Sequence, residues 1–394
     1  MGDVRTQVGI VGAGPAGLLL SHLLHLRGIE SVVLEARSRE YVERRVRAGV
    51  LEQGTVDILT GVGVGDRLHR DGLVHHGIEL RFGGAGHRIA FERLVPGRAI
   101  TVYGQQEVVK DLIAARLAAG GDIRFEVSDV RPEGFDGDRP AISFREGSEE
   151  VRLECDVIAG CDGFHGVCRP AIPDGVLEVF EREYPFAWLG VLAAVAPSTE
   201  ELIYAYTDEG FALHSMRGPE ISRFYLQVRP DEDIAEWPDE RIWAQLRHRL
   251  ETVPDWKLAT GPVIEKAVAA VRSFVAEPMR CGRMYLAGDA AHIVPPTGAK
   301  GLNLAVADVT VLSEALAAWY SSGETELLDA YSATCLRRVW RVQHFSWWMT
   351  TLTHRFDEDD AYGRRLQASY RDYVCTSTAA ATSLAENYVG LAHV

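Results

Sequence analysis

The sequence of 394 residues predicts an α/β protein with three parts: a doubly wound, Rossmann-like domain, a domain built on a mixed β-sheet, and a helical C-terminal region. Three observations lead to this class. A strand–helix–strand pattern opens the chain, short apolar strands alternate with turn signals over about 178–228, and the chain after 300 has mostly helical spacing. We therefore expect the first domain at 1–175, completed by about 270–300, the second at 176–269, and the helical interface region at 300–394.

The opening elements follow from apolar spacing. Residues 6–11 form a short apolar, β-branched run that is typical of a buried strand. Pro15–Leu26 has helical spacing, and Gly28 lies where that helix is expected to end. Residues 31–35 form a second strand. Strand, helix and strand in close succession predict a parallel sheet.

Later elements are predicted in the same way. We expect helices at 107–119 and Asp239–Leu250, and a strand at 156–160. A further buried strand is expected at 283–287, followed by a helix from 301 to 320.

Composition excludes several classes of function. The 41 basic residues against 56 acidic ones give a formal net charge of −15, which disfavours nucleic acid as a partner. No apolar run approaches the ~20 residues of a membrane helix, and no signal peptide is expected. The six cysteines include no C-x-x-C pair, so we expect reduced thiols, no metal site and a cytoplasmic protein.

A dinucleotide-binding fingerprint lies between the first two elements. Gly12-Ala-Gly14-Pro-Ala-Gly17 matches G-x-G-x-x-G, follows a strand and opens a helix, and Glu35 ends the second strand. The glycines allow a tight turn, a close approach of the pyrophosphate, and packing of helix on strand. The carboxylate of Glu35 is expected to accept hydrogen bonds from the adenosine ribose.

Two further segments end predicted strands and point to the same ligand. Cys161-Asp162-Gly163 follows one strand, and residues 287–292 follow another and lead to the glycine-rich start of a helix. Ligands of doubly wound sheets lie at the carboxyl ends of strands, so both segments can reach one cofactor. The carboxylate of Asp289 can bind a ribityl hydroxyl, and the helix that follows can face a flavin carbonyl with its positive end.

The fingerprint with Glu35, the Asp162-Gly163 pair and the Gly288-Asp289-Ala-Ala-His292 segment occur in an order that resembles the group A flavoprotein aromatic hydroxylases. Segments 47–54, 160–166, 287–304, 345–350 and 385–391 extend this resemblance over nearly the whole chain. The resemblance implies FAD as cofactor, with NADH or NADPH and O₂ as cosubstrates.

The same resemblance implies an activity and an assembly. The expected reaction is hydroxylation of 4-hydroxybenzoate at the 3-position to 3,4-dihydroxybenzoate (protocatechuate), by way of a flavin C4a-hydroperoxide, in a homodimer. Two alternatives stay open: a hydroxylase of a related hydroxybenzoate, and a flavin-binding regulatory protein without turnover. The substrate spectrum distinguishes the first alternative, and a lack of substrate-stimulated NAD(P)H oxidation would favour the second.

Polar residues on the predicted strands of the second domain form a candidate substrate site. Ser215 and Arg217 alternate on one strand face, and Tyr225 lies on the next strand. Arginine suits bidentate capture of a carboxylate. The residues alone favour a solvated strand face with one structural ion pair, but the resemblance assigns all three to the substrate carboxylate.

The resemblance also implies a proton relay. It assigns activation of the phenol to Tyr204, with Tyr388 as its relay partner and His75 as the group that exchanges the proton with solvent. A phenol has a pKa near ~10, so a base is needed to form phenolate at neutral pH. Pro296 matches the proline whose carbonyl contacts the substrate hydroxyl, and Thr297 lies beside it.

Other positions are assigned to the cofactors mainly by resemblance, in addition to the strand-end residues already named. Those expected at FAD, besides the fingerprint residues, are Arg45, Arg47, Gln105, Asp162, Arg223, Gly288, Asp289, Gly298, Leu302 and Asn303. Those expected at the nicotinamide cosubstrate are Arg37, Tyr41, Arg47, His165 and Arg272.

The segment after Glu35 bears on the choice of cosubstrate. Ala36 occupies a position where NADPH-specific relatives carry an arginine, and Glu40 and Glu43 would repel a 2′-phosphate. We therefore expect NADH to be preferred, or both cosubstrates to be used.

Overall fold

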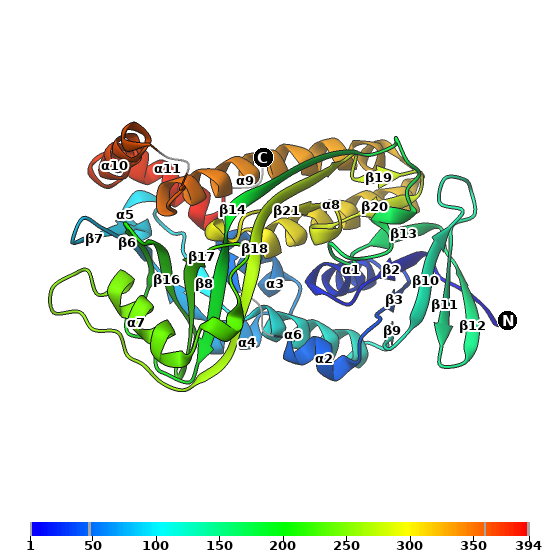
Figure 1. Ribbon diagram of the computed structural model, residues 1–394. Helices are drawn as coiled ribbons and strands as arrows, with labels where there is room; N and C mark the ends of the chain where they lie inside the picture. Colours follow the sequence, from blue (N-terminus) through cyan, green and yellow to red (C-terminus); the bar gives the residue numbers. More distant parts are fainter. Residues whose placement is uncertain (1, 46–48, 358–359, 392–394) are drawn as a thin grey trace.

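The structure is a computed structural model that describes residues 2–45, 49–357 and 360–391. A six-stranded sheet forms the first layer of the fold, and its central strands are parallel. The helices α1, α6 and α8 lie against it, with α1 packed on both of the others (Figure 1). The elements of this part are β2 (Val8–Val11), α1 (Pro15–Leu26), β3 (Ser31–Leu34), α6 (Gln105–Ala118), β9 (Asp122–Arg124), β13 (Val157–Gly160), β19 (Arg280–Cys281), β20 (Met284–Leu286) and α8 (Gly301–Ser322).

An eight-stranded sheet forms the second part. Its order is β21-β18-β14-β17-β16-β15-β6-β7, antiparallel except where β15 pairs with β6. Its strands are β6 (Gly77–Phe82), β7 (Ala85–Ala90), β14 (Glu178–Ala193), β15 (Leu202–Thr207), β16 (Gly210–Gly218), β17 (Ile221–Val228), β18 (Val263–Glu277) and β21 (His292–Ile293). Strands β6 and β7 come from the segment expected in the first domain, so the sheet crosses the linear boundary at 175.

The two faces of this sheet bury different cores. Odd positions of β14, such as Leu189 and Val191, pack with Trp243 of α7 (Asp239–Leu250). Even positions, such as Phe186 and Trp188, pack with residues of the C-terminal helices. This alternation is what a strand buried on both faces requires. The second face carries the candidate substrate residues.

Smaller sheets flank these layers. A three-stranded sheet of β4 (Val50–Glu52), β8 (Ile100–Val102) and β5 (Leu73–His75) lies next to α3 (Gln53–Gly61). A four-stranded sheet extends from the first domain at the N-terminal end (Figure 1). It contains β1 (Gly2–Arg5), β12 (Glu149–Glu154), β11 (Ala141–Glu146) and β10 (Ser128–Glu133), and the short helices are α2 (Arg39–Arg44), α4 (Asp66–Asp71) and α5 (Phe91–Leu94).

The C-terminal helices join the two main parts. The long helix α9 (Glu326–Thr353) runs along both sheets, and α10 (Ala361–Thr376) and α11 (Thr378–Val389) follow at its far end (Figure 1). Because α9 reaches both parts, it connects the predicted cofactor region with the predicted substrate region.

Helix α8 bears on the expectation that the chain has no membrane helix. With 22 residues and a mean hydropathy of 1.4, it is long and apolar enough by composition to cross a membrane, although no such segment was expected. However, 61% of its apolar stretch is buried inside the fold, where it packs against α1 and α9. These properties are those of a core helix.

Expected and observed elements differ mainly in the strands. Helices α1 and α7 have the expected bounds, and α6 begins two residues early. In contrast, β14 is one strand of 16 residues where shorter strands were expected. This strand pairs with β17 along one edge and with β18 along the other, so both of its edges are hydrogen-bonded.

Candidate active site

The glycine fingerprint forms the turn between β2 and α1. Gly12 has φ +103°, a conformation that favours glycine, and a side chain there would collide with the backbone of Cys161. A methyl group on Gly17 would collide with the carbonyl oxygen of Gly12. At Gly14, by contrast, a methyl group would meet nothing within 4 Å. The helix N-terminus thus faces open space, as binding of a pyrophosphate requires.

That open space belongs to a cavity of about 1000 Å³. The cavity lies at the carboxyl ends of the parallel strands, where such folds bind dinucleotides. It is lined by many of the residues expected at FAD or the nicotinamide cosubstrate: Gly12, Gly14, Glu35, Arg37, Tyr41, Arg45, Gln105, Asp162, His165, Arg272, Gly288, Asp289 and Leu302.

Polar groups of this lining fit an extended cofactor. Glu35 accepts hydrogen bonds from the backbone nitrogens of Ala13 (2.9 Å) and Arg37 (2.8 Å), which hold its carboxylate at the end of β3. Asp162 accepts two backbone hydrogen bonds through Oδ2, whereas its buried Oδ1 has no hydrogen-bond partner in the described structure. The same is true of Oε1 of Gln106, a lining residue that the sequence did not indicate. Both are acceptors available to the hydroxyl and amide groups of FAD.

A buried ion pair supports the second strand-end segment. Oδ2 of Asp308 accepts from the backbone nitrogen of Gly288 at 2.9 Å and lies 2.7 Å from Nε2 of His292. Burial lowers the pKa of His292, but the adjacent Asp308 carboxylate outweighs it and the net pKa is raised. Asp308 was not expected at the site. The available signal was a carboxylate in the middle of an apolar helix.

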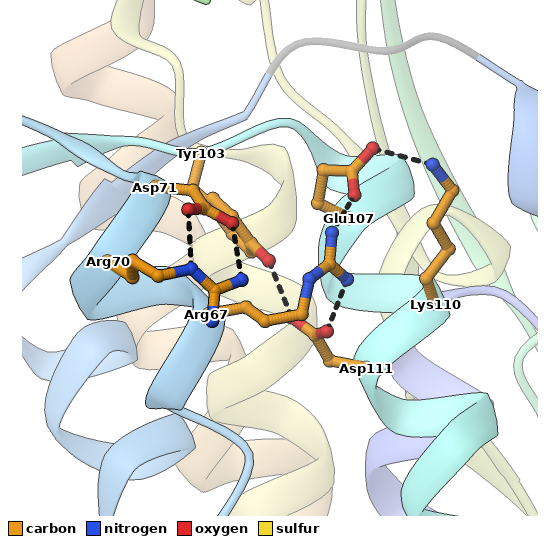
Figure 2. Close-up of polar contacts among 7 residues, drawn as sticks. All are labelled: Arg67, Arg70, Asp71, Tyr103, Glu107, Lys110 and Asp111. Atoms are coloured by element: carbon orange, nitrogen blue, oxygen red, sulfur yellow. Dashed lines mark hydrogen bonds and ion pairs between the residues drawn. The ribbon is translucent and has the colours of Figure 1, made fainter.

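An ion-pair network fixes the start of α6, which presents Gln105 and Gln106 to the cavity. Figure 2 shows Arg67 of α4 placed between two carboxylates of α6, Glu107 and Asp111. The Arg67–Asp111 distance is 2.5 Å, and the hydroxyl of Tyr103 donates to Asp111 at 2.6 Å. The network ties α6 to α4 and to the chain after β8.

The candidate carboxylate site lies on the face of the large sheet that is turned away from α7. Nη1 of the half-buried Arg217 donates to Oγ of Ser215 at 2.8 Å and to the carbonyl oxygen of Met216 at 2.7 Å. Its Nη2 lies 3.5 Å from the hydroxyl of Tyr225, and its buried Nε has no partner. No acidic side chain of the described residues pairs with it, and burial lowers its pKa. One edge of the guanidinium is therefore available to an anion.

A buried tyrosine pair lies at the same sheet face, with Tyr204 on β15 and Tyr388 on α11 packed against it. The hydroxyls of Tyr204 and Tyr388 are 2.5 Å apart, and the Tyr204 hydroxyl donates to the carbonyl oxygen of Thr297 at 3.0 Å. Burial raises the pKa of both phenols, so both are protonated at neutral pH. Tyr204 can donate only one proton, so Tyr388 donates to Tyr204 in this arrangement. Pro296, next to Thr297, is exposed.

His75 is buried on β5, and neither ring nitrogen has a hydrogen-bond partner among the described residues. Burial lowers its pKa to about 4, so the ring is neutral at neutral pH. The described structure contains no hydrogen bond that joins it to Tyr388. A relay between the two would need a bridging group.

Two charged residues near the tyrosine pair, Lys300 and Glu52, were not expected at the site from the sequence. Lys300 is buried, lies 2.6 Å from Oε1 of Glu52, and donates to the carbonyl oxygen of Tyr388 at 2.8 Å. Burial lowers the pKa of Lys300. A lysine inside the glycine-rich segment before α8 was the only signal.

Some expected cofactor residues do not line the cavity. Asn303 links α8 to β4, donating to the carbonyl oxygen of Val50 and accepting from Thr55. Gly298 lies against Ser346 of α9, and Arg223 lies 3.6 Å from Glu265. Arg47 lies outside the described residues. Within the described ranges, no group of three or more His, Cys, Asp or Glu residues could hold a metal ion.

Comparisons with known proteins identify the family and relatives of this chain. Residues 5–346 match the FAD binding domain family. The p-hydroxybenzoate hydroxylase of Acinetobacter baylyi is 49% identical over 391 residues, covering 99% of this chain and 96% of the relative. The 3-(3-hydroxy-phenyl)propionate/3-hydroxycinnamic acid hydroxylase of Mycobacterium avium is 28% identical, covering 84% of this chain and 58% of the relative.

The fold is also found among solved structures. The crystal structure of p-nitrophenol 4-monooxygenase from Pseudomonas putida superposes with a TM-score of 0.82 and covers all of both chains. Its sequence identity is 22%, so this likeness supports the fold alone.

Proposed function

The chain belongs to the FAD-binding family of group A aromatic hydroxylases and is a flavin-dependent aromatic monooxygenase that uses FAD, NAD(P)H and O₂, and on that premise we propose 4-hydroxybenzoate as its substrate and 3,4-dihydroxybenzoate as its product. The observation that carries the choice is Arg217, whose free guanidinium edge lies on the sheet face that also carries the tyrosine pair. The name of the Acinetobacter relative supports the same substrate.

The spacing of the two groups supports a para-substituted acid. Tyr204 pairs with Leu213 across β15 and β16, and Ser215 lies two residues further along the same face of β16. Two strand residues span about 7 Å. A benzene ring with a carboxylate and a hydroxyl at opposite ends is of similar length. A meta-hydroxyl lies off the axis that joins the carboxylate to the far end of the ring, so it fits this spacing less well.

The residues of the chain then have separate tasks. FAD, when bound in the cavity, supplies the activated oxygen. Arg217, Ser215 and Tyr225 hold the carboxylate and so orient the ring. The substrate phenol gives its proton to the Tyr204 oxygen, and Tyr204 turns its own hydrogen from the Thr297 carbonyl to Tyr388. Tyr388 in turn releases its proton towards His75. The buried aromatic surroundings exclude water from the reacting carbon.

Oxidation of NADH and NADPH by the FAD-loaded protein, with and without 4-hydroxybenzoate, tests this proposal. We expect strong stimulation by the acid and nearly one 3,4-dihydroxybenzoate per NAD(P)H, measured by chromatography. Stimulation that yields only hydrogen peroxide would replace the substrate with a related hydroxybenzoate. No stimulation would refute the roles of Arg217 and the tyrosine pair.

We also propose that NADH is preferred, or that both cosubstrates are used. Within α2, Arg39 is paired with Glu43 at 2.6 Å and Arg44 with Glu40 at 2.7 Å. Ala36 offers no charge, so a 2′-phosphate would have to compete with these glutamates. The ratio of kcat/KM for the two cosubstrates decides the matter, and a large advantage of NADPH would contradict the proposal.

A homodimer is proposed as the assembly. Helix α10 exposes an apolar and aromatic stripe at helical spacing, and Trp347 of α9 is also exposed, which supports a partner surface. The stripe is formed by Tyr362, Leu366, Tyr370 and Tyr373. Light scattering on the holoenzyme should give twice the chain mass, and Tyr370→Asp should shift it towards the monomer.

We further propose a cytoplasmic location, which the six free cysteines support.

A further inference from the structure

We propose that His354 is a positioning residue for the substrate site, holding Trp188 beside the carboxylate end while Thr350, one helical turn earlier, holds Thr297 at the hydroxyl end. The inference rests on the proposed function. It concerns two residues, His354 and Trp188, that do not belong to the proton relay or to the carboxylate site.

Hydrogen bonding fixes the tautomer of His354. Its Nε2 lies 2.7 Å from the indole Nε1 of Trp188, and an indole nitrogen can only donate. Nε2 must therefore be the acceptor, and the ring proton sits on Nδ1. That nitrogen lies 3.1 Å from the carbonyl oxygen of Thr350 and 3.0 Å from Oγ1 of Thr353. Burial lowers the pKa of His354 to about 3, so the ring stays neutral at working pH.

Aromatic packing fixes the plane of the same ring. His354 stacks on Phe211 with centroids 4.2 Å apart and on Phe186 at 4.6 Å. Trp188 in turn lies 4.9 Å from the ring of Tyr225, one of the carboxylate residues. A shift of the indole would therefore be transmitted to Tyr225 and to the Arg217 edge beside it.

The other end of the same helical turn reaches the hydroxyl end of the site. Oγ1 of Thr350 lies 2.8 Å from Oγ1 of Thr297, and the carbonyl oxygen of Thr297 accepts from Tyr204. The last turn of α9 is thus fastened to both ends of the substrate site. The structure assigns to this turn the spacing between the carboxylate and hydroxyl ends, and with it the preference for para-hydroxy acids.

The test compares three substitutions in the FAD-loaded enzyme. Trp188→Phe keeps an aromatic ring but removes the donor, His354→Phe keeps the stacking but removes the acceptor, and His354→Gln restores an acceptor. We expect the two Phe variants to raise KM for 4-hydroxybenzoate by about tenfold, with a smaller change in kcat. A tenfold change corresponds to one hydrogen bond of ~1.4 kcal/mol. Both variants should also divert more NAD(P)H to hydrogen peroxide. His354→Gln should recover at least half of the coupling.

A matched control separates positioning from general stability. Trp243→Phe makes the same change on the opposite face of the same sheet, in the core shared with α7. It should leave KM and coupling unchanged even where it lowers the melting temperature. The indole N–H resonance of Trp188, assigned by its loss in Trp188→Phe, should shift upfield in His354→Phe and return in His354→Gln.

The outcomes distinguish the two proposals. If wild type does not respond to 4-hydroxybenzoate, the proposed substrate is wrong, and binding of benzoate then tests the positioning role through the carboxylate end alone. If wild type responds but the Phe variants match the Trp243 control in KM and coupling, the positioning role is overturned. If the Trp188 indole N–H resonance has the same position in His354→Phe as in wild type, the positioning role is also overturned.

Discussion

Arg217→Lys tests the geometry of the carboxylate site most directly. Nη1 is already used by Ser215 and Met216, so an incoming carboxylate meets the edge formed by Nε and Nη2. Lysine keeps the positive charge but cannot present two parallel donors. Losing one charge-assisted hydrogen bond costs about 1.5–3 kcal/mol, which corresponds to about a 10- to 150-fold weaker Kd for 4-hydroxybenzoate.

The assay is the change in flavin absorbance as 4-hydroxybenzoate is added to the oxidised holoenzyme. Ser215→Ala serves as a graded comparison, because it removes a neutral hydroxyl, for which about 0.5–1.5 kcal/mol and a 2- to 12-fold effect are expected. A Kd of Arg217→Lys within twofold of wild type would refute the bidentate reasoning. An equal loss in both variants would show that charge geometry is not what the site uses.

Other predictions concern stability and the cofactor. Burial lowers the pKa of His214 from 6.5 to about 3. Between these two pH values the unfolded chain therefore binds more protons than the folded one. The free energy of unfolding is then highest above pH 6.5 and falls by about 1.4 kcal/mol for each pH unit below it. His214→Asn should flatten this dependence in urea unfolding at pH 7 and 4.5, and an unaltered slope would contradict the assignment. Asp308→Asn should weaken FAD binding at least tenfold in fluorescence titration, because it loosens Gly288; unchanged affinity would exclude that role. Gly14→Ala should leave the melting temperature of the cofactor-free protein unchanged but weaken FAD binding, whereas Gly17→Ala should lower that melting temperature. Equal melting temperatures of the two variants would refute the steric distinction.

Much of this architecture could be predicted from local patterns in the sequence. The fingerprint glycines and the bounds of α1 follow from spacing and turn chemistry, which neighbouring residues determine. Arg217 and Ser215 could be placed together because they lie two residues apart on one strand. The family relationship, confirmed by the comparisons, added the activity and the cofactor.

What the sequence did not reveal depends on residues far apart in the chain. Glu52 and Lys300 meet across 248 positions, and no periodicity pairs a carboxylate with a lysine at that separation. Strands β6 and β7 join the large sheet through pairing with β15, more than a hundred residues later. His354 was invisible for the same reason, since its function depends on an indole 166 positions away.

The length of helix α9 also sets the distance between the cofactor region and the substrate site. Near its start, Ser332 accepts from the backbone nitrogen of Met279 beside β20, and at its end Thr350 and His354 reach the substrate site. One inserted residue would turn everything downstream by about 100° and advance it by about 1.5 Å. We therefore expect this stretch to tolerate exchanges of residues but not insertions or deletions. A single alanine inserted after Arg338 should abolish the response to substrate while FAD is still retained.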